Sequence, residues 1–163
     1  MDIGNQNLSS NKKIIILNYE MGNLWSISSA IDYLGYDFTI TDNPHLIKES
    51  THIILPGVGS FRKAVENLKK KKLFDLIKNI VETKRSKILG ICLGFQLLGN
   101  SSDEDGFTEG FKFIDFDVRK FTGEELGNCK IPHIGFNTVQ TPKKSLLFKG
   151  LSNKSDFYFV HSY

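Results

Sequence analysis

Four short apolar runs constrain the fold of this chain more than any other feature of its sequence. The first, Ile14-Ile15-Ile16-Leu17, is rich in β-branched residues and suits a strand that is buried on both faces. The other three are residues 38–40, 52–55 and 87–91. Runs of this kind are typical of parallel sheets covered by helices on both sides.

The segments between these runs carry apolar residues at helical spacing. This spacing extends from Leu24 to Leu34, and Gly35 follows where a helix would be expected to end. Further helical patterns occupy residues 61–68, 73–81 and 93–98, the last ending near Gly99-Asn100. The alternation predicts an α/β fold with an open, mostly parallel, doubly wound sheet and flanking helices.

Beyond residue 100 the pattern changes. Residues 101–110 are acidic and contain glycine, which predicts a surface loop, and residues 111–121 alternate like antiparallel strand or hairpin material. Residues 138–139 and 157–160 are the last strand candidates. We expect residues 1–11 to form a disordered lead-in. We expect residues 12–163 to form one domain, since no boundary divides them.

Composition narrows the function classes. The formal charge is +3 and the basic residues are scattered, so nothing indicates a nucleic-acid partner. No apolar run is long enough for a transmembrane helix, and no secretory signal is present, so we expect a cytoplasmic protein. Its two cysteines, Cys92 and Cys129, have no Cys/His spacing typical of zinc, and a reducing compartment disfavours a disulfide. We expect no metal and no cofactor.

Cys92 lies in a pattern that predicts a nucleophile. Gly90 and Gly94 flank it, each two residues away, between a predicted strand and a predicted helix. This is the sequence of a nucleophile elbow, a tight turn that presents a side chain above the carboxyl edge of a sheet. The helix start favours the thiolate, and the N–H of Leu93 is free to bind an oxyanion. The alternative is a small buried cysteine, which is our interpretation of Cys129.

A second loop falls at the same edge of the predicted sheet. The segment Pro56-Gly57-Val58-Gly59-Ser60 follows one strand and precedes a helix. Its two glycines allow backbone amides to turn outward toward an anion. Such a loop also serves as a plain connection between strand and helix, but beside Cys92 it would supply a second oxyanion donor.

Five segments, taken in order, resemble the triad-type (class I) glutamine amidotransferases. They are residues 18–23, 55–61, 89–98, 132–137 and 157–163, including Leu89-Gly90-Ile91-Cys92-Leu93-Gly94-Phe95-Gln96 and Phe157-Tyr158-Phe159-Val160-His161-Ser162-Tyr163. Within that group the resemblance is closest to the glutaminase subunits of imidazole glycerol phosphate synthase, an enzyme of histidine biosynthesis.

The resemblance implies an activity and a set of site residues. Cys92 would attack the side-chain amide of glutamine, giving a thioester and ammonia, and water would then release glutamate. The oxyanion donors would come from Val58, Gly59 and Leu93. The substrate would be held by Gly57, Gln96, His161, Ser162 and Tyr163. The ammonia would pass to a synthase (cyclase) partner with a (β/α)8 barrel, in a heterodimer with residues 132–137 near the interface.

Three residues differ from the family pattern and allow a second interpretation, in which the ammonia goes to a different acceptor. Asn18 stands where aspartate is usual, Glu20 where glycine is usual, and Phe136 where tryptophan is usual. Similar divergence occurs in paralogues that supply ammonia for amino sugars of surface polysaccharides. The reaction would be the same amide hydrolysis with a different acceptor.

A further departure concerns the catalytic base. Family members continue beyond the position of Tyr163 to a His-Pro-Glu segment, whose histidine and glutamate complete the triad. These two residues are absent from this chain, so we expect a truncated domain whose C-terminal part is missing. His133 and His161 match other positions and are not expected to substitute. A catalytically dead binding module is therefore an alternative. A cysteine hydrolase or chaperone with a related elbow is another, and Gln96 and the closing His161-Ser162-Tyr163 argue against it.

Overall fold

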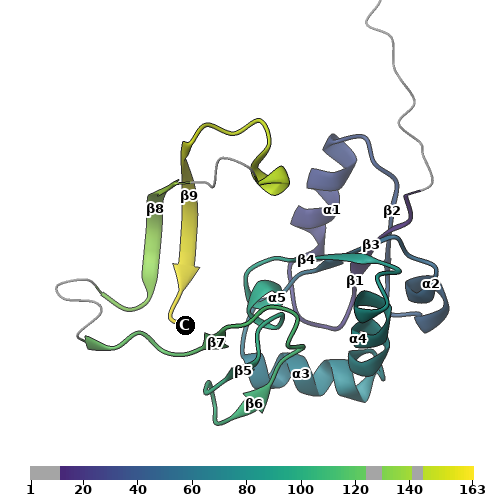
Figure 1. Cartoon of the computed structure of the whole chain (residues 1–163), viewed down its shortest axis with the longest axis horizontal. Helices are drawn as coiled ribbons and strands as arrows, with labels where there is room; N and C mark the ends of the chain where they lie inside the picture. Colours follow the sequence, from purple (N-terminus) through teal and green to yellow (C-terminus); the bar gives the residue numbers. More distant parts are fainter. Residues whose placement is uncertain (1–11, 124–129, 141–144) are drawn as a thin grey trace, which may run out of the picture. The chain divides into compact units, whose positions relative to one another are not determined.

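A computed structural model describes residues 12–123, 130–140 and 145–163. The chain forms two compact units, one ending at Val118 and one running from Arg119 to Tyr163, and each is described by itself (Figure 1). The predicted lead-in and Cys129 lie outside the described residues. That residues 12–163 form one domain stays a prediction.

The first unit is built on a four-stranded parallel sheet. Its strands are β1 (Ile14–Leu17), β2 (Phe38–Thr41), β3 (His52–Leu55) and β4 (Lys87–Gly90), in the order β2-β1-β3-β4. Ile16 pairs with Ile40 on one side and Ile54 on the other, and Leu55 pairs with Gly90. The chain therefore starts in the middle of the sheet and winds outward in both directions, and the predicted α/β class is confirmed.

Helices connect these strands. They are α1 (Leu24–Tyr33), α2 (Pro44–Lys48), α3 (Phe61–Lys70), α4 (Phe74–Glu82) and α5 (Leu93–Gln96). In Figure 1, α1 lies on one side of the sheet, and α3 and α4 lie on the other. Asn23 and Ser60 cap α1 and α3, each accepting a hydrogen bond from the backbone of the first turn. Gly35, with a φ of 74°, ends α1 as predicted.

Two helices differ from the prediction. The sequence did not indicate α2, because its five residues are too few to show a helical period. The helix after Cys92 is a single turn that ends at Gln96, whereas the apolar pattern predicted one that continued nearly to Gly99. A one-turn helix has a smaller dipole than the longer helix that we expected.

The prediction for residues 101–121 is wrong in detail. Short strands β5 (Ser101–Ser102), β6 (Thr108–Glu109) and β7 (Asp117–Val118) form a three-stranded sheet in the order β6-β5-β7. Most of the alternating stretch is not a strand. Two of its aromatic residues form a stack instead, where the ring of Phe111 lies 4.4 Å from that of Phe74 and 5.1 Å from that of Phe113.

The second unit contains an antiparallel pair of strands, which include the two segments that the sequence predicted as the last strands. They are β8 (His133–Gln140) and β9 (Lys154–His161), with His133 opposite His161 and Gln140 opposite Lys154. A 3₁₀ helix, η1 (Leu146–Phe148), lies between them in the chain. Both strands are longer than the predicted ones, because the pairing continues into polar residues such as Asn137 and Asp156.

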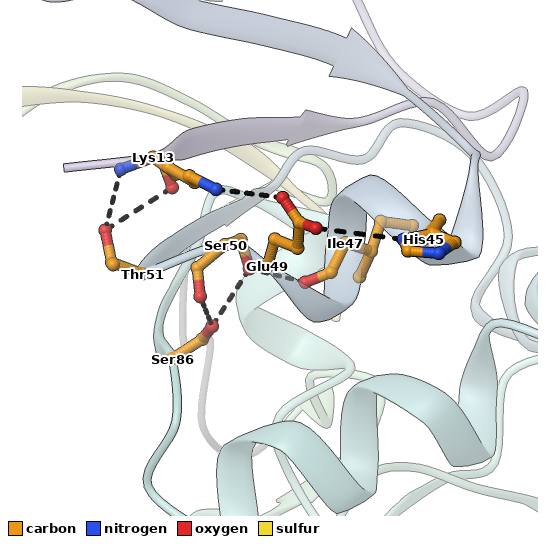
Figure 2. A network of polar contacts seen from close by, with 7 residues as sticks. All are labelled: Lys13, His45, Ile47, Glu49, Ser50, Thr51 and Ser86. Carbon is orange, nitrogen blue, oxygen red and sulfur yellow. Dashed lines mark hydrogen bonds and ion pairs between the residues drawn. The ribbon is translucent and has the colours of Figure 1, made fainter. Parts of the chain in front are cut away.

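A network of polar contacts fastens the amino-terminal edge of the parallel sheet (Figure 2). The hydroxyl of Ser50 donates to the carbonyl of Ile47 at 2.8 Å and lies 2.9 Å from the hydroxyl of Ser86. Both serines are buried. Lys13 Nζ lies 2.8 Å from Glu49 Oε2. These contacts join the segments that enter β1, β3 and β4, so they fix the starting points of three neighbouring strands.

In the part of the chain that the structure describes, no helix has the length and apolar character needed to cross a membrane.

Candidate active site at the carboxyl edge of the sheet

Two loops leave the parallel sheet side by side. Strand β3 ends at Leu55 and β4 ends at Gly90, and these two residues are paired in the sheet. The N–H of Ile91 then donates to the carbonyl of Leu55 at 3.0 Å, which extends the pairing by one residue. The 56–60 loop and the turn at Cys92 therefore begin next to each other, as the sequence predicted.

Cys92 occupies a strained turn between β4 and α5. Its φ of 55° and ψ of −118° lie in a region that residues with a side chain rarely adopt. A backbone of this kind typically costs on the order of 1–3 kcal/mol, and such strain is concentrated at functional sites. The side chain is exposed, so the alternative of a buried structural cysteine does not fit. The turn has the form of a nucleophile elbow.

The glycines around Cys92 are required by close packing. A Cβ at Gly94 would lie 1.8 Å from the carbonyl oxygen of Leu55, and one at Gly90 would lie 2.5 Å from the Cα of Phe95. Neither clash can be relieved by moving a flexible side chain. The first turn of α5 is thus held directly against the end of β3, and this contact fixes the position of Cys92.

The 56–60 loop packs against the same turn. A Cβ at Gly57 would lie 2.8 Å from the Cβ of Leu93 and 2.9 Å from the backbone N of Gly94. Gly59 has a φ of 101°, which glycine adopts without strain. Within the described residues, the N–H groups of Val58 and Leu93 donate no hydrogen bond to the protein. These two amides are available as donors to a ligand, which is the role that the resemblance implies.

Tyr19 is a buried partner of this loop that the sequence did not single out. Its hydroxyl donates to the carbonyl of Pro56, and its side chain is 0% exposed. Burial raises the pKa of the Tyr19 phenol, and the nearby Cys92 thiolate raises this pKa further. Tyr19 is therefore neutral at physiological pH and lies within electrostatic range of the candidate nucleophile.

The acidic loop at 103–106 also contributes to this edge. Glu104 Oε2 accepts a hydrogen bond from the N–H of Phe61 at 2.9 Å, and Asp105 Oδ2 accepts one from the hydroxyl of Ser60 at 2.8 Å. Two carboxylates therefore stabilise the N-terminal end of α3, where negative charge is favoured. The sequence predicted a surface loop here but not these contacts, which connect residues more than 40 positions apart.

Glu20, which stands where glycine is usual in the family, has a backbone conformation that favours glycine. Glu20 has a φ of 68°, a conformation that glycine adopts more easily, which accounts for the usual glycine at this position. Its carboxylate lies 3.0 Å from Lys71 Nζ, which is also 2.8 Å from Asp42. The Lys71 ammonium lowers the pKa of both carboxyl groups.

The remaining predicted residues fall in two places. Gln96 ends α5 and is half-buried. His161, Ser162 and Tyr163 belong to the second unit, so their position beside the substrate stays a prediction. There His161 Nε2 lies 2.9 Å from His133 Nδ1, so the two histidines are hydrogen-bonded to each other.

The other two histidines, His45 and His52, lie toward the amino-terminal edge of the sheet, at the opposite edge from Cys92. His52 is the first residue of β3, at the amino-terminal edge, and His45 lies in α2. Burial lowers the pKa of His52. The structure therefore brings together Cys92, Leu93 and the Gly57–Gly59 loop, and places neither of these histidines at the carboxyl edge.

Comparisons with known proteins agree with this geometry. A sequence model of the family Glutamine amidotransferase class-I matches residues 15–163. The chain is 46% identical over 151 residues to imidazole glycerol phosphate synthase subunit HisH 1 of Parasynechococcus marenigrum, covering 93% of this chain and 72% of that protein. It is 43% identical over 150 residues to HisH 1 of Campylobacter jejuni, covering 92% of this chain and 74% of the relative.

A solved structure described as a crystal structure of glutamine amidotransferase has the same fold. It superimposes with a TM-score of 0.69 at 13% sequence identity, covering 90% of this chain and 70% of the other. The resemblance inferred from the five segments is confirmed.

Proposed function

Because the chain belongs to the class-I glutamine amidotransferase family, we propose that it hydrolyses glutamine to glutamate and ammonia with Cys92 as the nucleophile. The observation that carries this proposal is the exposed Cys92 in a left-handed backbone conformation, next to two unpaired amides. A cysteine with only a packing role would have no reason to occupy so strained a position.

The reaction follows from these groups. The Cys92 thiolate attacks the side-chain amide carbon of glutamine, and the carbonyl oxygen becomes an oxyanion. The N–H groups of Leu93 and of the 58–59 segment would stabilise that charge. The intermediate then collapses, expelling the nitrogen as ammonia once it has gained a proton, and leaves a γ-glutamyl thioester. Water cleaves the thioester, which releases glutamate and restores the thiol.

The rest of the substrate site is part of the same proposal. Gln96 lies one turn beyond Cys92 and would contact the amino-acid end of glutamine. His161, Ser162 and Tyr163 would complete the site, largely through backbone groups. The family resemblance supports these roles.

The acceptor that we propose for the ammonia is a synthase subunit of histidine biosynthesis. The names of the relatives support this choice, since each is called a subunit of imidazole glycerol phosphate synthase. We propose a heterodimer with a cyclase that has a (β/α)8 barrel, located in the cytoplasm, with residues 132–137 near the interface. The departures at Asn18, Glu20 and Phe136 are the feature that favours an amino-sugar acceptor instead.

A glutaminase assay tests the proposal. Purified chain should release glutamate from glutamine, the rate should increase when a cyclase subunit is added, and Cys92→Ala should abolish release in both conditions. Cys129→Ala is the matched control and should retain the activity. Binding of the cyclase without glutamate formation would contradict the proposal and identify the chain as a binding module.

A further inference from the structure

Tyr19 connects three parts of the first unit. It follows β1, and its carbonyl oxygen accepts a hydrogen bond from Asn67 Nδ2 of α3 at 3.2 Å. Its hydroxyl donates to the carbonyl of Pro56, the first residue after β3. The side chain is fully buried, and Asn67 is 7% exposed. Tyr19 is therefore held at its backbone by α3, and it holds in turn the loop that leaves β3.

The Tyr19 hydroxyl lies at the start of the candidate oxyanion loop. A Cβ at Gly57 would be 2.8 Å from the Tyr19 oxygen and 2.8 Å from the Cβ of Leu93. The space that a side chain of Gly57 would need is thus filled by the phenol oxygen and by the first turn of α5. A residue with a side chain could not occupy this space without moving one of these neighbours.

The hydrogen bond to Pro56 sets the orientation of the peptide group between Pro56 and Gly57. A peptide group is planar and trans, so its C=O and the following N–H point in opposite directions. Holding the Pro56 carbonyl toward Tyr19 therefore fixes the plane of the Pro56–Gly57 peptide and the N–H of Gly57. It also fixes the starting direction for the peptides of Val58 and Gly59. A phenol has one proton to donate, and here the proton is given to Pro56 rather than to the thiolate.

We propose that Tyr19 is a positioning residue, whose hydroxyl sets the orientation of the Gly57–Gly59 amides and so prepares them to receive an oxyanion formed at Cys92. That an oxyanion forms at Cys92 rests on the proposed function. The orientation of the Gly57–Gly59 amides does not depend on it and can be measured without any reaction.

Tyr19→Phe removes only the hydroxyl, and two reactions of Cys92 separate positioning from nucleophilicity. The γ-(p-nitrophenyl) ester of glutamate acylates a thiol through a tetrahedral oxyanion, and its leaving group needs no acid. Iodoacetamide alkylates the same thiol by direct displacement and forms no oxyanion. We expect Tyr19→Phe to lower the acylation rate constant by about tenfold or more, and to leave the alkylation rate constant within about twofold.

A matched control accounts for lost stability. Ser86→Ala also removes a buried hydroxyl, but at the opposite edge of the sheet, where Ser86 contacts Ser50. It should lower the melting temperature as Tyr19→Phe does and leave the ratio of acylation to alkylation unchanged. The backbone ¹⁵N order parameters of Gly57, Val58 and Gly59, measured by NMR relaxation, give the direct readout. These order parameters should fall in Tyr19→Phe and stay at the wild-type values in Ser86→Ala.

The outcomes are distinct. An unchanged ratio together with unchanged order parameters in Tyr19→Phe would overturn the inference and leave Tyr19 a packing residue. A parallel fall in both variants would overturn it as well, since the effect would then follow stability alone. A wild-type chain that gives no nitrophenol burst would contradict the proposed function, and equal order parameters in wild type and Tyr19→Phe would then reject the role of Tyr19 in the loop too.

Discussion

At the scale of single residues, the site depends on positions where only one kind of side chain fits. The strained backbone of Cys92 is accommodated because Gly94 lets α5 approach the end of β3, and Gly90 lets the backbone of Phe95 approach the end of β4. The strain is maintained by packing around the turn, as expected where the surrounding structure determines a backbone conformation.

Gly94→Ala tests this packing. The added methyl would lie 1.8 Å from the carbonyl oxygen of Leu55, so either α5 or β3 must move. We expect the free energy of unfolding to fall by roughly 3 kcal/mol or more, as in strong overpacking. Chemical denaturation measures it, with Gly123→Ala as the control, because a Cβ there meets no atom within 4 Å. Equal stability of the two variants would show that α5 is not held against β3.

Glu20→Gly tests whether the left-handed backbone at this position costs stability. Glycine relieves the strain at a φ of 68°, whereas the ion pair that is lost is exposed. We expect the melting temperature to rise by roughly 1–3 °C. Glu20→Ala is the matched control, because it removes the same ion pair and keeps the strain, and it should not raise the melting temperature. A rise in both variants would mean that the carboxylate itself is unfavourable.

At the scale of elements, the carboxyl edge is fastened by contacts between segments far apart in the chain. Glu104 and Asp105 hold the start of α3, Tyr19 holds the loop after β3, and Lys71 joins the ends of β1 and β2 through Glu20 and Asp42. These contacts hold the segments that follow β1, β2 and β3 and the start of α3.

The Lys71 contacts predict a dependence of stability on pH. The pKa values of Glu20 and Asp42 are lowered in the folded state, chiefly by hydrogen bonds from Lys71. Their contribution to stability is therefore present above the ordinary values of 4.5 and 3.8 and is lost as pH falls through the lower folded values. Lys71→Met should weaken the loss of stability in this acidic range, as measured by melting temperature against pH. Lys48→Met should leave that profile as in the wild type, and an unchanged profile in Lys71→Met would contradict the assignment.

The elements that the sequence could predict are those with strong local signals. The parallel strands coincide with runs of β-branched residues, and the elbow follows from two glycines around a cysteine. Helix α2 was not predictable because its signal is too short. The strand prediction for the stretch after residue 110 is wrong because Phe111 and Phe113 follow the alternating pattern of a strand but stack beside Phe74. The role of Tyr19 also escaped prediction, since nothing local shows that its hydroxyl meets Pro56, 37 residues away.

At the scale of the whole molecule, the two units divide the predicted site. The first contains the nucleophile and the candidate oxyanion donors, and the second contains His161, Ser162 and Tyr163 at the end of its hairpin. Protection of Cys92 by glutamine reports substrate binding as well as thiol chemistry, so it is a sharper test than the reactivity of the thiol alone.

Labelling with the glutamine analogue 6-diazo-5-oxonorleucine, located by peptide mass spectrometry, tests the central claim most directly. We expect an adduct on Cys92 and none on Cys129, with labelling suppressed by excess glutamine but not by excess asparagine. Cys92→Ser should take up no label. Absence of an adduct on Cys92, or labelling that glutamine does not suppress, would contradict the claim that this elbow is a glutamine-hydrolysing site.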